Sequence, residues 1–313
     1  MIGNEFLWTE KYRPRTVKDT ILPKHLKAIF QKFVDQKDLP NLLLYGTSGV
    51  GKTSVALAAL DEIGCDSIKI NASWERNLDT LETKVKQFAS SISISGGRKY
   101  VIFDEADWLN ANSTQPALKT FMEDYSKNCG FIFTCNFKNR ILDAIHSRCS
   151  LVNFKISKEE KAGLAQEFFK RVQGILDTEK VAYDPKAVAA LITMHFPDFR
   201  RTLNELQTYS ASGKIDSGIL AQLSDESFKK LIGFMKEKNF SEIRKWVGTI
   251  EPDSGTVFRR LYDTVADTMK APQDISTLVV VLAEYQYKAA FVADHQINLV
   301  ACLVEIMANC NFK

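Results

Sequence analysis

The residues with the clearest chemistry lie between positions 46 and 53. Gly46-Thr-Ser-Gly-Val-Gly-Lys52-Thr53 fits the spacing G-x-x-x-x-G-K-[ST] and stands between an apolar run and an amphipathic stretch, the strand and helix that this motif requires. Glycines allow a tight turn whose backbone N–H groups point inward, and the helix adds its positive end. The motif predicts a phosphate-binding loop, with Lys52 at the β- and γ-phosphates and Thr53 as an oxygen ligand of Mg²⁺. A glycine-rich connecting turn is the alternative.

Two adjacent carboxylates end a second apolar run, Val101-Ile-Phe-Asp104-Glu105. Beside a phosphate loop, Asp104 is expected to hold the Mg²⁺ shell through water, and Glu105 to polarise the water that attacks the γ-phosphate. Asn136 follows another apolar run, at the edge where open α/β sheets bind ligands, so its amide could contact the γ-phosphate or orient that water. A turn-forming asparagine is the alternative. Spacing along the chain does not show where Arg148 lies, and an ordinary surface arginine is the alternative.

Short apolar runs alternate with helical patterns over the first 150 residues, which predicts a parallel sheet with crossover helices. The predicted strands are 41–45, 67–70, 100–103 and 130–134. A helix is predicted over 52–63, and apolar residues repeat at helical spacing from Leu78 to Phe88. The fold class is therefore α/β, with a phosphate loop in the first domain, residues 1–154.

The strand signal ends after Phe154, and helix-start signals follow. Ser157 with Glu160 forms a capping box, Asp184-Pro185 an N-cap with proline at the first helical position, and Pro197-Asp198 opens a third helix. These three helices predict a small all-α domain over 155–221. The rest, 222–313, is predicted to be helical over 228–237, 241–247, 257–269, 276–287 and 291–308. Its apolar positions indicate either a core or an interface, and the alternatives stay open: Leu282, Tyr285, Phe291, Leu299, Leu303 and Ile306.

Composition narrows the class of protein. The 313 residues are 45% hydrophobic and 25% charged, which excludes disordered and collagenous chains. Apolar runs stay below the roughly 18 residues of a membrane helix and a secretory signal is missing at the start, so a cytoplasmic location is expected. Six scattered cysteines without metal spacing predict free thiols and no structural metal. A net charge of +3 does not by itself establish a nucleic-acid partner.

Six motifs in order carry a family resemblance: Trp8-Thr-Glu-Lys-Tyr-Arg-Pro14, Asn71-Ala-Ser73 with Glu75-Arg76, Asp104-Glu-Ala-Asp107, Ala117-Leu-Lys-Thr-Phe-Met-Glu123, Ser147-Arg-Cys149 and Phe199-Arg-Arg-Thr-Leu-Asn204. From residue 8 to about residue 210, the chain resembles the small ATPase subunits of sliding-clamp loaders, the replication factor C branch of the AAA+ ATPases. The wording Phe196-Pro-Asp-Phe-Arg200 and the chain length resemble the ATPase subunits of T-even-type phage clamp loaders most. The four-cysteine zinc module of bacterial motor subunits is missing.

The resemblance implies an AAA+ domain, a helical lid and a helical collar, and it assigns roles. The adenine pocket would include Glu10, Lys11, Tyr12 and Ile21. The phosphates of ATP would be held by Gly46, Gly49, Val50, Gly51, Lys52, Thr53 and Ser54, and Mg²⁺ by Thr53 and Asp104. Catalysis would use Lys52, Glu105, Asn136 as γ-phosphate sensor, Arg200 as a cis contact from the lid, and Arg148 as an arginine that enters the ATP site of the next subunit.

The resemblance also implies contacts to DNA from Arg76, Thr80, Lys84 and Lys119. Family members often have a second arginine where this chain has Glu82, and a solvated helix face is the alternative. The implied partners are further copies of the chain, a different clamp-loader subunit, a sliding clamp and primer-template DNA, without a membrane. The function would be ATP-driven opening and loading of the clamp, in the host bacterial cytoplasm if the chain is of phage origin. Two alternatives are another AAA+ DNA motor, such as a helicase loader or branch-migration ATPase, and a subunit that binds nucleotide without hydrolysis.

Overall fold

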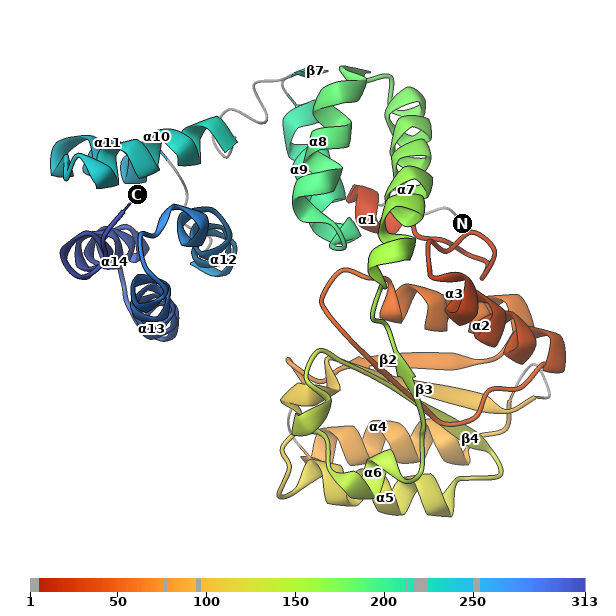
Figure 1. The fold of residues 1–313 in the computed structure, drawn as a ribbon. Coiled ribbons are helices and arrows are strands. Elements are labelled where there is room, and N and C mark those ends of the chain that lie inside the picture. Colours follow the sequence, from red (N-terminus) through yellow and green to blue (C-terminus); the bar gives the residue numbers. More distant parts are fainter. Residues whose placement is uncertain are drawn as a thin grey trace. The chain divides into compact units, whose positions relative to one another are not determined.

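Five short strands form one parallel sheet in the order β2-β3-β4-β1-β5 (Figure 1). The strands are β1 (Leu42–Tyr45), β2 (Ser67–Asn71), β3 (Lys99–Asp104), β4 (Cys129–Cys135) and β5 (Ser150–Asn153). The four predicted strands are present. The fifth, β5, was not predicted, because it lies at the sheet edge and three of its four side chains are exposed, so it lacks the apolar run of a strand buried on both faces.

Side chains alternate between the two faces of the sheet, as the strand repeat dictates. Leu43, Val101 and Phe133 face α4 (Leu78–Ser90), α5 (Thr114–Asp124) and α6 (Asp143–His146). Leu42, Leu44 and Ile102 face α2 (Lys24–Gln36) and α3 (Lys52–Ile63). Helices therefore cover both faces (Figure 1), and the carboxyl ends of the strands stay open, next to α1 (Trp8–Lys11) and the helices that follow the sheet. The predicted α/β fold is confirmed.

Three helices follow the sheet: α7 (Lys158–Thr178), α8 (Pro185–His195) and α9 (Phe199–Ser210). Each begins where its capping signal predicts. The side chains of Ser157, Asp184 and Asp198 accept hydrogen bonds from the first-turn amides of Glu160, Lys186 and Arg201. Two-residue strands, β6 (Ala182–Tyr183) and β7 (Lys214–Ile215), pair in parallel beside them. Two short 3₁₀ turns, η1 (Ala106–Trp108) and η2 (Lys138–Arg140), complete this part of the chain.

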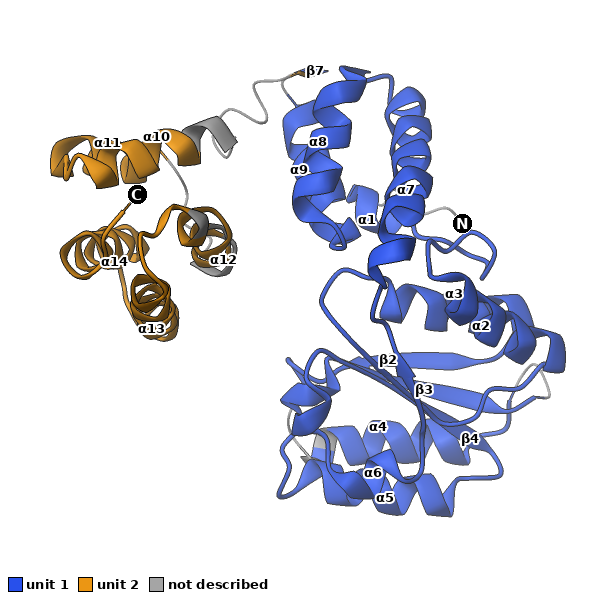
Figure 2. Cartoon of the chain, viewed as in Figure 1, with its two compact units in different colours: residues 1–215 blue, residues 216–313 orange. Residues whose placement is uncertain are grey.

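This computed structural model describes residues 6–75, 78–93, 97–211, 213–216, 225–249 and 254–312. It divides into two units, residues 1–215 and 216–313 (Figure 2). The first unit holds the sheet and the three helices after it, so the predicted boundary at residue 155 stays a prediction. The predicted boundary at residue 222 lies outside the described residues.

The second unit is helical and has its own core. Its helices are α10 (Asp225–Lys236), α11 (Phe240–Gly248), α12 (Ser254–Val265), the 3₁₀ turn η4 (Ala266–Thr268), α13 (Pro272–Lys288) and α14 (His295–Asn309). Five of the six apolar positions named above are buried in it, and Phe291 is 73% exposed. The last helix was predicted to begin at Phe291. It begins four residues later, because Asp294 accepts hydrogen bonds from the amides of Gln296 and Ile297 and so caps it.

The six cysteines are free thiols, as their spacing predicted. Within the described ranges, none of the helices is both long and apolar enough to cross a membrane.

Candidate nucleotide site

The loop from Gly46 to Gly51 joins β1 to α3 at the carboxyl edge of the sheet. Gly49 and Gly51 have φ angles of +74° and +93°, the left-handed region that glycine enters without steric cost. Gly49 is also packed against the lid: a Cβ there would lie 1.8 Å from Oδ1 of Asp198, and its carbonyl accepts a 3.2 Å hydrogen bond from the amide of Phe199. The phosphate loop and the start of α9 therefore meet at this glycine.

Gly49→Ala is expected to lower the free energy of unfolding of the first unit by about 1–3 kcal/mol from backbone strain alone. It should also weaken nucleotide binding, because the added methyl group displaces Asp198 and with it α9. Gly64→Ala is the matched control, since Gly64 has a similar φ of +79° but nothing in the described structure lies within 4 Å of its added Cβ. Thermal unfolding and nucleotide titration of both variants measure this. Equal nucleotide affinity in the two variants would contradict it.

Lys52 is buried at the base of the loop, 9% exposed. Its Nζ donates to the carbonyl oxygens of Gly46 and Thr47, both at 2.8 Å, and to Oδ1 of Asn136 at 2.9 Å. Burial lowers the pKa of this ammonium to about 8. Phosphate oxygens in the loop would bring negative charge beside it and favour the charged form. The structure thus brings two predicted phosphate-contacting residues, 84 positions apart, into direct contact.

Asp104 and Thr53 lie together at the ends of neighbouring elements. Oδ1 of Asp104 accepts from the hydroxyls of Thr53, at 2.7 Å, and of Thr134, at 2.6 Å. One carboxylate and a hydroxyl, next to a phosphate loop, fit Mg²⁺, which keeps several waters and takes its other ligands from substrate phosphates. Among the described residues no cluster of three or more histidine, cysteine or acidic side chains could hold a metal. The carboxylate of Asp104 and the hydroxyl of Thr53 suit a metal that arrives with the nucleotide.

Glu105 has a left-handed backbone, with φ +57°, which is uncommon for a residue other than glycine and is concentrated at functional sites. Its amide donates to Oγ1 of Thr134 at 3.2 Å. This conformation turns the chain out of β3 and lets Glu105 line the same cavity as Lys52 and Asp104. A carboxylate placed there can act on a water beside the γ-phosphate.

Asp107 was not assigned a role from the sequence, and it organises the loop after β4. Its side chain is 7% exposed, and its Oδ2 accepts from the amides of Asn136 and Phe137, both at 3.3 Å. The buried carboxylate thereby holds the main chain of Asn136 next to the loop. The sequence signal that could have marked Asp107 is its position three residues after Asp104, on the turn that follows β3.

A single cavity in the first unit gathers most of the predicted nucleotide contacts. It is lined by Glu10, Tyr12, Ile21, Gly49, Val50, Gly51, Lys52, Thr53, Ser54, Asp104, Glu105, Asn136 and Arg200. The lid and N-terminal segment add residues that were not predicted to contact nucleotide, four of them inside motifs named above: Thr9, Arg13, Phe199 and Leu203, together with Thr20, Phe168 and Arg171. Their contribution depends on how α7 and α9 fold back over the loop, which local patterns do not reveal.

Two predicted contacts lie elsewhere. Lys11 is not among the lining residues; its Nζ pairs at 2.6 Å with Glu179, the residue directly after α7, and the hydroxyl of Tyr12 donates to the same carboxylate. The amide of Trp8 donates to Gln207 of α9 at 2.9 Å. These bonds attach the N-terminal segment to the lid. Lys11 lies outside the cavity because its ammonium pairs with Glu179. Gly46, the first residue of the loop, does not line the cavity either, and its carbonyl accepts from Lys52.

Comparison with known proteins identifies the family. Residues 42–157 match the model "ATPase family associated with various cellular activities (AAA)", and residues 160–221 match the lid domain of the "sliding-clamp-loader large subunit". The chain is 29% identical to the sliding-clamp-loader large subunit of Enterobacteria phage T4, over 99% of this chain and 98% of that one. It is 31% identical to the replication factor C small subunit of Sulfurisphaera tokodaii, over 97% and 96%. The chain belongs to the clamp-loader family of AAA+ ATPases.

Solved structures agree on the fold. RuvB variants from Thermotoga maritima superpose with TM-scores of 0.53 and 0.54 at 12–14% identity, covering 83% of this chain. That similarity concerns the fold alone. Membership of the clamp-loader family identifies the protein as a nucleotide-binding ATP hydrolase and confirms the resemblance drawn from the sequence.

Arg148 does not line the cavity of its own chain. It lies before β5, and its carbonyl accepts from Asn41, which precedes β1. The phosphate loop follows the opposite end of β1, and five residue steps of about 3.3 Å separate the two edges by roughly 16 Å. The guanidinium donates to Glu123, at 3.0 Å through Nε, and to the carbonyl of Ala144, at 2.8 Å. In this clamp-loader ATPase, Arg148 therefore lies at the opposite edge of the sheet from its own nucleotide site.

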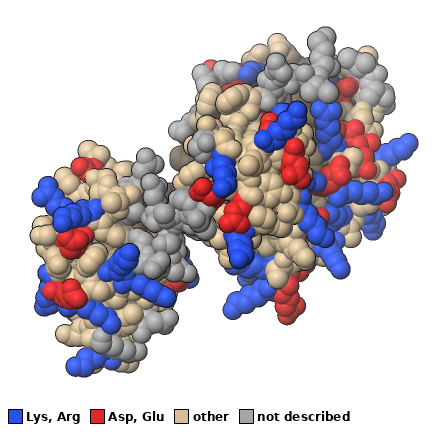
Figure 3. All heavy atoms as spheres, turned by 90° about the horizontal axis from the view of Figure 1, so that it is seen from above, with Lys and Arg blue, Asp and Glu red and all other residues tan. Residues whose placement is uncertain are grey.

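The predicted DNA-contacting residues are placed in part. Arg76 and the side chain of Thr80 lie outside the described residues. Lys84 on α4 pairs with Glu75, and Lys119 is half-buried on the neighbouring α5. Figure 3 shows the side of the first unit opposite to α4 and α5, and there basic and acidic side chains intermix. The positive charge of the two described lysines is thus partly neutralised or covered within the chain.

Proposed function

We propose that this protein is the ATPase subunit of a sliding-clamp loader, which uses ATP binding and hydrolysis to open a processivity clamp and load it at primer-template DNA. The observation that carries the proposal is the separation of Arg148 from the phosphate loop of its own chain. A nucleotide site whose arginine lies at the other edge of the sheet requires a second subunit to complete it, which suits a ring of subunits driven by ATP.

Each active site in this proposal is shared by two neighbours. One chain supplies Lys52, Thr53, Asp104, Glu105 and Asn136, and Arg200 approaches from its lid. The next chain supplies Arg148, whose guanidinium stabilises charge on the transferred phosphoryl group. Bound ATP and Mg²⁺ then bridge lid, loop and neighbour, and hydrolysis removes these bridges and releases clamp and DNA.

The second unit is proposed to act as the collar that holds copies of the chain and a different clamp-loader subunit together. Large apolar side chains on and beside α13 and α14 are exposed: Val280 at 65%, Tyr287 at 70%, Phe291 at 73% and Ile297 at 68%. Exposed apolar groups of this kind support a protein interface. The first unit is proposed to meet DNA through Arg76, Thr80, Lys84 and Lys119, by phosphate contacts that carry no base preference.

The test compares ATP hydrolysis by the assembled loader with and without primed DNA and the clamp of the same replication system. The rate is expected to rise when both are added, and the stimulation to weaken as salt increases, because phosphate contacts release counterions. If the rate of ATP hydrolysis rises with DNA alone and does not change when the clamp is added, a different DNA motor would be favoured. Equal rates under all conditions would contradict clamp loading while leaving ATP hydrolysis in place.

A further inference from the structure

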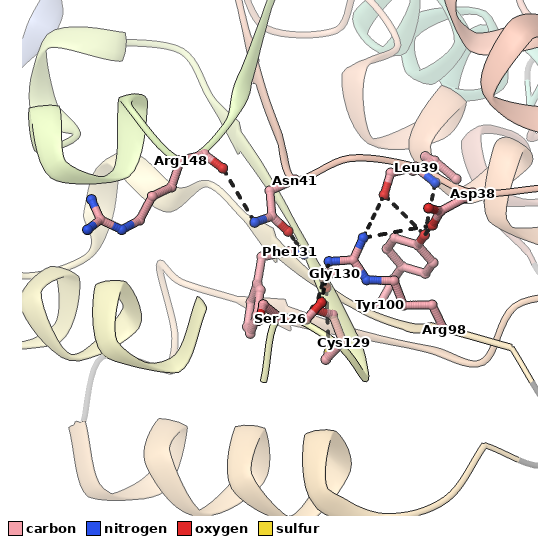
Figure 4. A network of polar contacts seen from close by, with 10 residues as sticks. All are labelled: Asp38, Leu39, Asn41, Arg98, Tyr100, Ser126, Cys129, Gly130, Phe131 and Arg148. Carbon is pink, nitrogen blue, oxygen red and sulfur yellow. Dashed lines mark hydrogen bonds and ion pairs between the residues drawn. The ribbon is translucent and has the colours of Figure 1, made fainter. Parts of the chain in front are cut away.

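Asn41 lies directly before β1 and joins three strands of the sheet. Its Oδ1 accepts a 2.9 Å hydrogen bond from the amide of Phe131 on β4, and its Nδ2 donates to the carbonyl of Arg148 at 3.4 Å. Its main-chain carbonyl accepts from the amide of Ser150, the first residue of β5, at 2.8 Å. Figure 4 shows the Asn41 amide between Arg148 and Phe131. Asn41 therefore contacts the chain on both sides of residue 149.

The main chain of Arg148 is held at both of its polar groups. Its amide donates to the carbonyl of Ile145 at 3.0 Å, and its carbonyl accepts from Asn41. The bond to Ile145 connects the amide of Arg148 to the short helix α6. Among the described contacts, only the bond from Asn41 connects the carbonyl of Arg148 to the sheet. The point from which the arginine side chain projects is thus held on its carbonyl side by a side chain 107 positions away.

The contacts of the guanidinium lie at the surface: besides Glu123, it donates to the carbonyl of Ala144 at 2.8 Å and to the hydroxyl of Ser147 at 3.2 Å. Its ion pair with Glu123 is partly exposed, with side-chain exposures of 30% and 54%. An exposed ion pair of this kind favours the paired over the unpaired side chains by no more than about fivefold. A nucleotide triphosphate, with several negative charges, can compete for this cation with one exposed carboxylate and two neutral oxygens, those of Ala144 and Ser147. The side chain can therefore exchange partners, while its main chain stays in place.

We propose that Asn41 is a positioning residue for the trans-acting Arg148: it fixes the main chain so that the guanidinium reaches the nucleotide of the neighbouring subunit. This inference rests on the proposed function, since it needs Arg148 to act in trans. Displacement of a catalytic group by about 1 Å can cost about 10²-fold in rate. Loss of one long hydrogen bond should allow a smaller displacement, so we expect a loss of roughly tenfold.

Asn41→Asp separates the two side-chain bonds of this residue. A carboxylate oxygen still accepts from the Phe131 amide, but the donor to the Arg148 carbonyl is replaced by an oxygen that repels it. In the assembled loader, N41D is expected to lower kcat roughly tenfold and to leave the KM for ATP and nucleotide binding by the single chain within about twofold of wild type. Asn41→Ala, which loses both bonds, should show the same loss of kcat with a larger fall in melting temperature.

Arg148→Ala in the same assay separates failure of this inference from failure of the proposed function. If R148A hydrolyses ATP like wild type, the trans arrangement is wrong and the role of Asn41 falls with it. If R148A is impaired while N41D keeps its kcat, or raises KM at constant kcat, the role of Asn41 alone is wrong. If N41D does not assemble, N41A carries the same test. With the role correct, N41D adds no further loss to the residual rate of R148A, since both act through one group.

Discussion

Replacing Arg148 by alanine is expected to lower the kcat of ATP hydrolysis in the assembled loader by about 10³- to 10⁵-fold. The loss is large because the guanidinium stabilises charge that develops on the transferred phosphoryl group. Nucleotide binding by the single chain should stay nearly unchanged, because Arg148 does not line the cavity of its own chain. Single-turnover hydrolysis and a nucleotide titration, run on the same preparation, measure the two effects separately.

The control uses the shared nature of the site. Lys52→Ala inactivates the phosphate loop and keeps Arg148, whereas R148A keeps the loop and loses the arginine. Mixed before assembly, the two inactive variants should recover part of the activity, since some R148A loops then face an intact Arg148. No recovery in verified mixed complexes, or equal losses of binding and hydrolysis in R148A, would show that the arginine does not act in trans.

Glu105→Gln is expected to lower kcat by about 10²- to 10⁴-fold, the usual contribution of a general base. The amide has the size of the carboxylate but cannot take the proton of the attacking water. The backbone at this position, with φ +57°, is not altered by the change, so ATP should still bind. Hydrolysis under single-turnover conditions and ATP affinity are the two measurements.

The matched control for this change is Glu167→Gln, which removes an exposed charge on α7 that pairs with Lys27 and lies outside the cavity. It should leave both measurements near wild type. If E105Q lost ATP affinity as strongly as activity, Glu105 would be part of the binding surface and another group would activate the water.

Much of the first unit was predictable because its signals are local. Strands buried on both faces carry their own apolar runs, and capping side chains such as Asp198 bond amides two or three residues away. The edge strand β5 was missed because an exposed strand lacks that run. The start of α14 was misplaced because apolar residues also precede Asp294, whose side chain caps the first turn of the helix and so sets where it begins.

In the candidate site, too, local motifs predicted some residues, and others depended on contacts between distant parts of the chain. The order of Lys52, Thr53, Asp104 and Glu105 along two motifs was enough to predict that they meet. Lys11 was expected in the cavity on the strength of a motif, but its ammonium reaches Glu179, a residue 168 positions away. Arg171 and Phe168 carry no local signal, because they join the cavity only when α7 lies beside the phosphate loop.

The amino-acid sequence alone determined the phosphate loop, its strand and helix, and the class of reaction, because these depend on spacing within a few residues. Only the tertiary structure decided which edge of the sheet each group occupies. The strand order β2-β3-β4-β1-β5 places β5 beside β1, so that Arg148 meets Asn41 at one edge while Gly49 and Asp198 meet at the other. Contacts between residues a hundred or more positions apart depend on this packing, and short-range patterns do not contain them.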